Sequence, residues 1–306
     1  MKSETFMIHS KCDDLPLSVL SVVPDQAAPK AIFQIVHGMA EMKERYLDFM
    51  TFLAENGYAC IIHDHRGHGR SVRSEEDLGY MYGAGAEGLV EDAHLITEEA
   101  KKRWPDIPVI LMGHSMGSLV VRCYVRKYDQ DIDRLIVMGS PAQNKAVGFA
   151  KALAGLVGLF KGSRHKSSFI NNAAFGSYLK GIENPQSEYD WLSLNRDNVH
   201  FYLENKYCGF IFTIDGFKAL FGVLEDTYKP EGWQMKNPEL PILFLSGEKD
   251  PCINGEVNFK KAMNFMKERG YRRVDGKLYE NLRHEILNED SRQDVYDDIL
   301  KWLANN

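Results

Sequence analysis

One serine in this chain stands in a pattern that is typical of an activated nucleophile. The pentapeptide Gly-His-Ser-Met-Gly at 113–117 fits G-x-S-x-G, between an apolar run at 109–112 and helical spacing at 116–128. A sharp turn from a strand into a helix strains the serine backbone, and the glycines give the crowded turn room. The pattern predicts that Ser115 Oγ stands at the carboxyl end of a sheet. The alternative is a glycine-rich turn with a surface serine.

A serine hydroxyl needs a neighbouring base before it can attack a carbonyl carbon. Where this motif occurs, an acid and then a histidine usually follow the serine along the chain. Asp250 follows the apolar run at 241–245, and His284 lies between the last predicted strand and the last predicted helix. We predict that His284 is the general base, and then the acid, and that Asp250 fixes its tautomer. The alternatives are Glu248 and Asp275 for the acid, and His37 and His114 for the base.

A second cluster suggests different chemistry. The loop His-Asp-His-Arg-Gly-His at 63–68 carries three histidines after a predicted strand, a spacing similar to the metal motif of the metallo-β-lactamase fold. That motif has an aspartate directly before its third histidine, where this chain has Gly67. We therefore expect no metal and no cofactor, and a metallohydrolase stays the alternative.

The elements that must position these residues follow a regular order. Apolar runs predict strands, and stretches with helical spacing separate them. This alternation is typical of an α/β protein with a mostly parallel sheet covered by helices on both faces. An alternating pair at 3–9 and 16–23 predicts a hairpin before them. The strands are predicted at 31–36, 58–62, 109–112, 132–138, 241–245 and 272–280.

One stretch of about a hundred residues shows helical spacing but no convincing strand, and a structureless loop of that length is not expected in a compact domain. We predict a core formed by residues 1–140 and 241–306, and a helical cap formed by residues 141–240. Its segment 146–160 is apolar almost all round. That segment is either buried or a lid face that transiently touches lipid interfaces.

Three motifs together give the chain a family resemblance. Val-His-Gly-Met-Ala-Glu at 36–41, Asp-His-Arg-Gly-His-Gly-Arg-Ser at 64–71 and the motif at 113–117, with the late Asp250 and His284, resemble an α/β-hydrolase. The branch is that of monoacylglycerol lipases and lysophospholipases, which is serine-aminopeptidase-like. The segments 189–193 and 208–210 are similar to cap segments of bacterial members. Ser118 departs from the family, which usually has a further glycine there.

The resemblance implies roles for four more residues. The backbone N–H groups of Met39 and Met116 would form an oxyanion hole, whereas the alternative for both is a plain core methionine. Glu41 and Arg45 match positions that line the alcohol-binding end of the pocket in monoacylglycerol lipases. Four residues apart, they could equally form an exposed ion pair on a helix.

Composition limits the compartment and the partners. The 306 residues include 37 basic and 43 acidic ones, a net charge of −6 with no long basic run, so no nucleic acid partner is expected. The five cysteines lack a C-x-x-C pair and predict free thiols. Cys252 is either a buried structural residue or a target of thiol reagents. With no predicted signal peptide or membrane span, we expect a cytoplasmic protein.

The predicted function is that of a serine hydrolase that cleaves carboxylic esters of small lipids through an acyl-enzyme. Apolar, aromatic cap helices suit an acyl chain. The alternatives are an acyl thioesterase, a non-catalytic binding protein of the same fold, and an aminopeptidase of the proline-iminopeptidase type. The last would need cap carboxylates to hold an α-amine. The candidates are Glu183, Glu188, Glu204 and Glu225.

Overall fold

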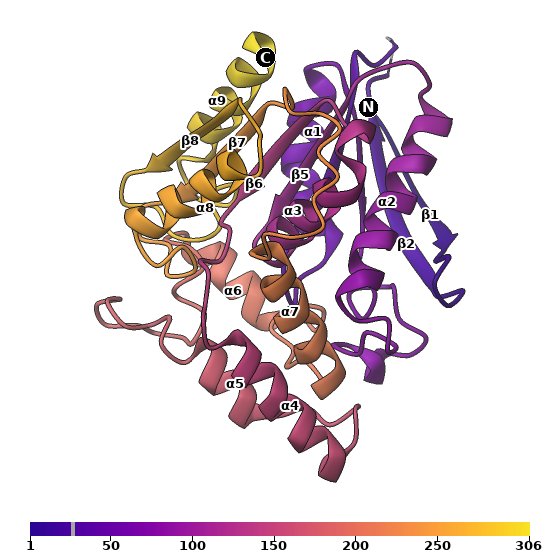
Figure 1. Cartoon of the computed structure of the whole chain (residues 1–306). Coiled ribbons are helices and arrows are strands. Elements are labelled where there is room, and N and C mark those ends of the chain that lie inside the picture. Colours follow the sequence, from indigo (N-terminus) through magenta and orange to yellow (C-terminus); the bar gives the residue numbers. More distant parts are fainter. Residues whose placement is uncertain (26–27) are drawn as a thin grey trace.

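A twisted sheet of eight strands runs through the molecule (Figure 1). The structure is a computed structural model that describes residues 1–25 and 28–306. The strand order is β1-β2-β4-β3-β5-β6-β7-β8; β1 pairs antiparallel with β2, β2 pairs antiparallel with β4, and the other pairs are parallel. The strands are β1 (Lys2–His9), β2 (Pro16–Val23), β3 (Ala31–Val36), β4 (Tyr58–His63), β5 (Val109–His114), β6 (Arg134–Met138), β7 (Ile242–Gly247) and β8 (Val274–Tyr279).

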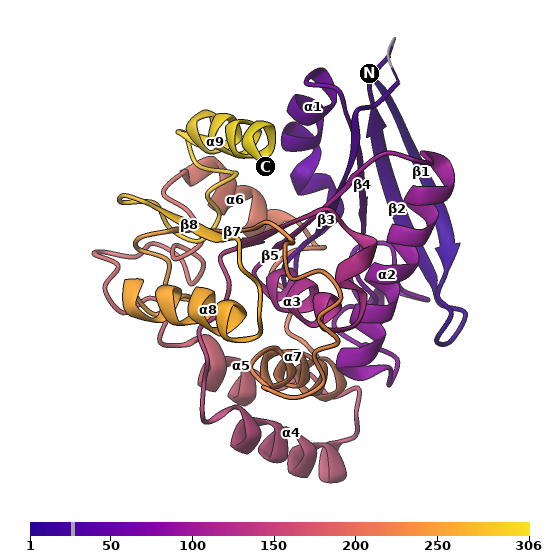
Figure 2. The same cartoon turned by 45° about the horizontal axis from the view of Figure 1, so that its top comes forward.

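Helices cover both faces of this sheet, as Figure 2 shows. On one face lie α1 (Leu47–Glu55) and α9 (Arg292–Asn305); on the other lie α2 (Gly85–Arg103), α3 (Met116–Tyr128) and α8 (Glu256–Glu268). Fully buried side chains of β3 to β7 point alternately into the two layers and form one apolar core on each side. Burial on both faces explains why these strands read as unbroken apolar runs. Short 3-10 turns lie at Lys43–Tyr46, Glu75–Asp77 and Asp129–Asp131.

Residues 141–240, which we call the inserted segment, lie between β6 and β7. Its helices are α4 (Val147–Lys161), α5 (Ser168–Phe175), α6 (Arg196–Glu204) and α7 (Ile214–Thr227). The last three begin at residues whose side chains accept backbone N–H bonds, namely Ser167, Asn195 and Thr213. Helix α7 packs against α2 and α3, whereas α4 and α5 lie at the outer end of the molecule (Figure 1).

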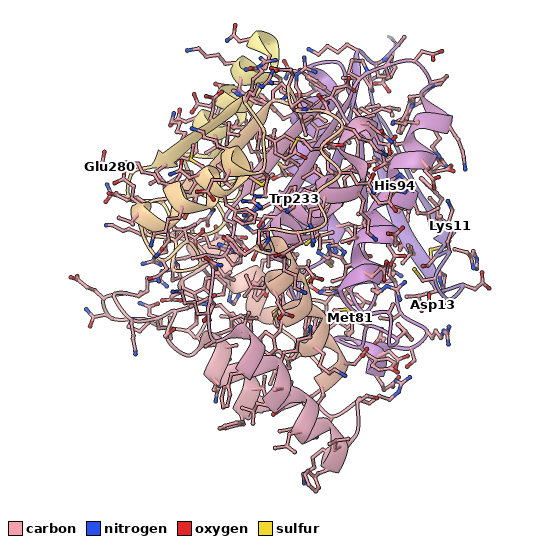
Figure 3. The ribbon with its side chains drawn as sticks, viewed as in Figure 1. Lys11, Asp13, Met81, His94, Trp233 and Glu280 are labelled. Atoms are coloured by element: carbon pink, nitrogen blue, oxygen red, sulfur yellow. The ribbon has the colours of Figure 1, made fainter. Side chains whose placement is uncertain are left out.

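The predicted α/β fold class is confirmed. Each predicted strand is present, with bounds shifted by a few residues, and the expected hairpin is formed by β1 and β2. These two strands place one edge of the sheet far from β8, so that Lys11 and Glu280 stand at opposite sides of the molecule (Figure 3). Within the described part of the chain, none of the helices combines the length and the apolar character needed to cross a membrane.

Candidate active site

Ser115 occupies the turn between β5 and α3. Its backbone has φ 54° and ψ −119°, a conformation that costs a residue with a Cβ about 1–3 kcal/mol and persists only where the surroundings impose it. The Ser115 N–H donates to the carbonyl oxygen of Met138 in the neighbouring strand at 2.9 Å. The turn therefore places the serine at the carboxyl ends of the parallel strands, where open α/β folds bind their ligands.

The glycines of this turn are required because two backbones meet there. A Cβ at Gly117 would lie 2.0 Å from the carbonyl oxygen of Val36 in β3, and a Cβ at Gly113 would lie 2.3 Å from the Gly117 oxygen. Ser118 is buried, and its Oγ donates to the Ser115 carbonyl oxygen at 2.5 Å. A serine at this position, where the family resemblance led us to expect glycine, therefore fits and adds a hydrogen bond to the turn.

Two backbone N–H groups in the pocket of Ser115 have no acceptor in the part of the chain that the structure describes. The N–H groups on either side of Met39 donate to Glu41 Oε1 at 2.6 Å and to His68 Nε2 at 3.1 Å. No acceptor is found among residues 1–25 and 28–306 for the N–H groups of Met39 and Met116 themselves. Both residues line the same pocket as Ser115. Such a pair of free donors can stabilise the negative charge that develops on a carbonyl oxygen during acyl transfer.

His284 and Asp250, which the order of residues in the sequence singled out, are in contact. His284 Nδ1 lies 2.9 Å from Asp250 Oδ2, and both side chains are buried. Because a carboxylate only accepts, Nδ1 carries the proton and Nε2 of the neutral ring is the acceptor. Asp250 is itself held by the Ser246 hydroxyl at 2.9 Å and by the Cys252 N–H at 2.8 Å. The alternative acids, Glu248 and Asp275, are exposed.

The environment stabilises the charged forms of both partners. Burial would raise the pKa of the Asp250 carboxyl group, but attraction to His284 and the hydrogen bonds that it accepts hold this pKa below its ordinary value. Burial would lower the pKa of His284, but the Asp250 carboxylate raises it above the ordinary value. The site therefore favours an imidazolium, which is the species that a histidine base forms when it takes a proton.

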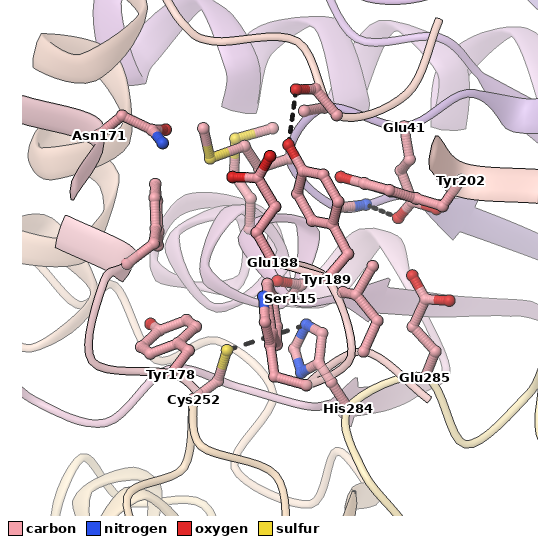
Figure 4. A pocket seen from close by; sticks show the side chains of 18 of the residues that line it. Glu41, Ser115, Asn171, Tyr178, Glu188, Tyr189, Tyr202, Cys252, His284 and Glu285 are labelled. Atoms are coloured by element: carbon pink, nitrogen blue, oxygen red, sulfur yellow. Dashed lines mark hydrogen bonds between the residues drawn. The ribbon is translucent and has the colours of Figure 1, made fainter. Parts of the chain in front are cut away.

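A mostly apolar pocket of about 230 Å³ opens beside Ser115 and His284 (Figure 4). Cys252 lies in its wall, with Sγ 3.9 Å from His284 Nε2. Burial raises the pKa of this thiol well above its ordinary value, so the thiol is protonated at neutral pH. Many of the other walls come from the inserted segment, including Phe175, Tyr178, Leu179, Trp191, Leu192 and Phe210.

A network of buried charges lies at one end of the pocket. The side chain of Arg45 is 2% exposed, and those of Glu41 and Glu285 are 3% exposed. Arg45 Nη1 donates to Glu41 Oε2 at 2.7 Å, and its two Nη atoms donate to the two oxygens of Glu285 at 2.7 and 2.5 Å. Glu41 and Glu285 line the pocket, with Arg45 behind them. Glu41 and Arg45 therefore form a buried ion pair, and not the exposed pair that was the alternative.

This network also holds the Met39 loop. Burial would raise the pKa of Glu41 and Glu285, but Arg45 holds both below their ordinary values. Glu41 Oε1 accepts from the Gly38 N–H and from the Tyr46 hydroxyl, the latter at 3.0 Å. Sequence reasoning missed Glu285, for which the only signal was its place next to His284.

The histidines of the 63–68 loop lie side by side without converging on a common point. The ring centres of His63 and His65 are 5.1 Å apart, and those of His65 and His68 are 5.8 Å apart. His65 Nε2 and His68 Nδ1 each lie 3.0 Å from a backbone carbonyl oxygen. Burial lowers the pKa of His63 to about 3 and of His68 to about 4. Among the described residues, the potential metal ligands whose ligand atoms lie within 4.8 Å of one another are Asp250, Cys252 and His284.

Comparison with known proteins places this geometry in a family. Residues 27–291 match the family model described as serine aminopeptidase, S33. The monoacylglycerol lipase of Mycolicibacterium smegmatis is 25% identical over 279 residues, which cover 91% of this chain and 89% of that protein. The proline iminopeptidase of Thermoplasma volcanium is 34% identical over 111 residues, 36% of this chain and 35% of that protein.

A solved structure shows the same fold over the whole length. A carboxyl esterase from Bacillus coagulans, crystallised in complex with glycerol, superposes with a TM-score of 0.91 at 23% identity, covering 100% of this chain and 99% of that one. The predicted α/β-hydrolase fold and the resemblance to the monoacylglycerol lipase branch are thus confirmed. Because the family model spans both halves of the sheet and the inserted segment, the chain belongs to the serine aminopeptidase S33 family of α/β-hydrolases.

Proposed function

We propose that this chain hydrolyses carboxylic esters of small lipids, of the monoacylglycerol or lysophospholipid type, through an acyl-enzyme on Ser115. One observation carries the proposal: a strained serine, two backbone N–H groups with no acceptor among the described residues (Met39 and Met116), and His284, which Asp250 contacts from behind, all line one mostly apolar pocket. Binding alone needs neither a strained serine nor a polarised histidine. The combination therefore supports catalysis over a non-catalytic binding role.

In the proposed reaction, Ser115 Oγ attacks the ester carbonyl carbon while His284 Nε2 accepts the hydroxyl proton. Negative charge develops on the carbonyl oxygen, where the N–H groups of Met39 and Met116 donate. The C–O bond then breaks, and His284 returns the proton to the leaving alcohol. A water molecule, deprotonated by His284, then attacks the acyl carbon. The bond from this carbon to Ser115 Oγ breaks, the acid is released, and His284 returns the proton to Oγ. Asp250 holds the Nδ1 proton and stabilises the imidazolium without being protonated itself. No cofactor takes part in these steps.

The two ends of the pocket suit the two halves of such a substrate. Aromatic and aliphatic walls favour an acyl chain, because the apolar surface of the chain is removed from water when it binds in the pocket. We assign the alcohol end to Glu41, whose carboxylate lines the pocket and is held in place by Arg45. An acyl thioesterase would use the same steps on a sulfur leaving group, and it stays an alternative.

A second candidate, an aminopeptidase, is favoured by one residue. Glu188 of the inserted segment lines the pocket with Ser115 (Figure 4), where its carboxylate could hold the free α-amine of a peptide. The other three candidates are not among the residues that line this pocket: Glu183 is exposed, Glu204 pairs with His200, and Glu225 pairs with Lys151. The sequence match to a proline iminopeptidase supports this candidate, but the mostly apolar walls favour the lipid ester.

We further propose that the inserted segment acts as a cap over the core, and that α4 touches anionic lipid surfaces. Phe149, Leu159 and Phe160 are 74%, 84% and 81% exposed, and Leu156 is 54% exposed. Residues 149, 156 and 160 share one face of α4, because their spacing is that of successive helical turns. Helix α4 lies at the outer end of the molecule (Figure 1).

The charged residues around α4 indicate that its exposed apolar face would contact an anionic surface. Residues 142–182 contain six basic residues and no acidic ones, in a chain whose net charge is −6. Two of the six, Lys151 and Arg164, pair with carboxylates of other segments. The other four are exposed and form no ion pair with any described residue; they are Lys145, Lys161, Lys166 and Lys180. Each basic residue near an anionic lipid surface contributes about 1 kcal/mol of attraction.

The expected compartment is the cytoplasm. All five cysteines are free thiols, and a reducing compartment keeps thiols in this state.

The first prediction concerns pH. The pKa of His284 is raised by Asp250 above 6.5, and only the neutral ring accepts a proton, so kcat/KM should fall as the pH drops through that raised value. In Asp250→Asn, burial without the carboxylate lowers this pKa, so the acid limb should move to lower pH. The plateau should fall about 10⁴-fold because the tautomer is lost. Glu248→Gln, at an exposed carboxylate nearby in the sequence, is the matched control. An acid limb that shifts in Glu248→Gln but not in Asp250→Asn would contradict the assignment of Asp250 as the partner of His284.

The second prediction tests the reaction and the substrate class. Wild type should hydrolyse 4-nitrophenyl esters of medium chain length and 1-monoacylglycerol faster than an amino-acid anilide. Folded Ser115→Ala should lose ester turnover by about 10⁴-fold or more. Unchanged turnover in that variant would exclude Ser115 as the nucleophile. A faster anilide reaction that Glu188→Gln abolishes, with ester turnover preserved, would favour the aminopeptidase instead.

The third prediction concerns the face of α4. The protein should co-sediment with vesicles that contain phosphatidylglycerol, more weakly with pure phosphatidylcholine, and less as salt increases. Replacing Phe149 and Phe160 together by serine should weaken binding to both kinds of vesicle. Replacing Phe201 and Leu203, exposed apolar residues of α6, serves as the matched control. Equal sedimentation of all three proteins would exclude α4 as the contact.

A further inference from the structure

The loop that carries His284 is held from two sides, and the first side is the core. This loop, residues 280–291, runs between β8 and α9 and crosses the end of β7. The Lys249 N–H donates to the Leu282 carbonyl oxygen at 2.9 Å. A Cβ at Gly247 would lie 2.1 Å from the Arg283 carbonyl oxygen, so the two backbones are in direct contact there.

The second side is a short stretch of the inserted segment, residues 190–198, which we call the clamp. The N–H of Glu285, next to the histidine, donates to the Leu192 carbonyl oxygen at 2.8 Å. Arg283, on the other side of the histidine, donates from Nη1 to the Ser193 carbonyl oxygen at 3.0 Å. Both chain neighbours of His284 are therefore bonded to the clamp.

One carboxylate organises the clamp. Glu289, five residues after the histidine, is only 1% exposed. It accepts from the Ser193 hydroxyl at 2.8 Å, from the Leu194 N–H at 2.9 Å and from the Asn195 N–H at 3.1 Å. From its own loop it accepts the N–H of Arg283 at 3.4 Å. Removing this acceptor would leave the buried Ser193 hydroxyl and the part-buried N–H groups of Leu194 and Arg283 without this partner, which loosens the contact between the loop and the clamp.

The clamp also reaches the charge network of the pocket. Asn195 begins α6, and Asn198 in the first turn of that helix donates from Nδ2 to Glu285 Oε2 at 2.7 Å. Asn198 Oδ1 accepts from Arg45 at 2.9 Å. An anchor at Glu289 therefore fixes the start of α6, and α6 in turn fixes Glu285 beside the histidine.

We propose that Glu289 is a positioning residue for His284, acting through the clamp. This inference rests on the proposed role of His284 as the base. Glu289 lies on the same loop as the histidine and accepts from four groups, whose residues are not among those that line the pocket. Its function is to keep the imidazole in contact with Asp250 and facing the pocket that it shares with Ser115. The clamp is accordingly a fixed wall of the active site.

The experiment compares Glu289→Ala and Glu289→Gln with Asp290→Ala, the exposed acidic neighbour, on one 4-nitrophenyl ester. A misplacement of about 1 Å costs roughly 10²-fold in rate, so Glu289→Ala should lower kcat about 10- to 100-fold with KM within about twofold. The acid limb of its pH profile should move to lower pH, because a looser contact with Asp250 raises the His284 pKa less. Glu289→Gln should recover part of kcat, since its amide oxygen still accepts. Asp290→Ala should match wild type.

His284→Ala tests the proposed base, so that a failure of the proposed function can be told apart from a failure of the positioning role of Glu289. If His284→Ala keeps its turnover, the proposed base is wrong. If His284→Ala is inactive while folded Glu289→Ala keeps the wild-type kcat and pH profile, Glu289 has no positioning role. Should Glu289→Ala fail to fold, Ser193→Ala removes one donor only. It is then expected to lower kcat and shift the acid limb in the same direction, and a wild-type result would equally contradict the inference.

Discussion

The contact between Gly117 and the end of β3 constrains the rest of the active site. Because the first turn of α3 lies against the Val36 carbonyl oxygen, β5 must turn sharply and Ser115 is held at φ 54°. The same approach brings the Met39 loop, which leaves β3, beside the N-terminus of α3, so that the N–H groups of Met39 and Met116 belong to the same pocket as the serine. The strain of about 1–3 kcal/mol at this residue is balanced by the packing of helix against sheet.

A second set of contacts joins this turn to the histidine loop through buried charge. Arg45 lies between two carboxylates; Glu41 holds the Met39 loop, and Glu285 adjoins His284. Removing one partner of a buried ion pair typically costs about 3–5 kcal/mol, because the remaining charge stays desolvated. The network is therefore less a source of stability than a device that keeps the N–H donors and the imidazole in one relative position.

Local patterns predicted the fold and the positions at which to look for the site. The apolar runs predicted the parallel strands β3 to β7, since burial on both faces removes alternation; β8, at the edge, is more polar and more exposed. The 113–117 motif could be located because a predicted strand precedes it and a predicted helix follows it. The order of residues singled out Asp250 and His284, which lie in contact. The contacts of Glu285 and Glu289 with the clamp join stretches about ninety residues apart, and Glu285 pairs with Arg45 240 residues away along the chain, so no local pattern encodes these contacts. The sequence also left open whether the segment 146–160 is buried or exposed, because a helix that is apolar almost all round is compatible with both positions.

The most direct test of the central claim is to find the acyl group during turnover. The protein would be mixed with a 4-nitrophenyl alkanoate, quenched in acid within one turnover and digested for mass spectrometry. We expect the acyl mass on the peptide that carries Ser115, at a level that falls as substrate is exhausted, and none in Ser115→Ala. An adduct on Cys252, which lies 3.9 Å from His284 Nε2, or turnover with no acylated peptide at all, would contradict the account.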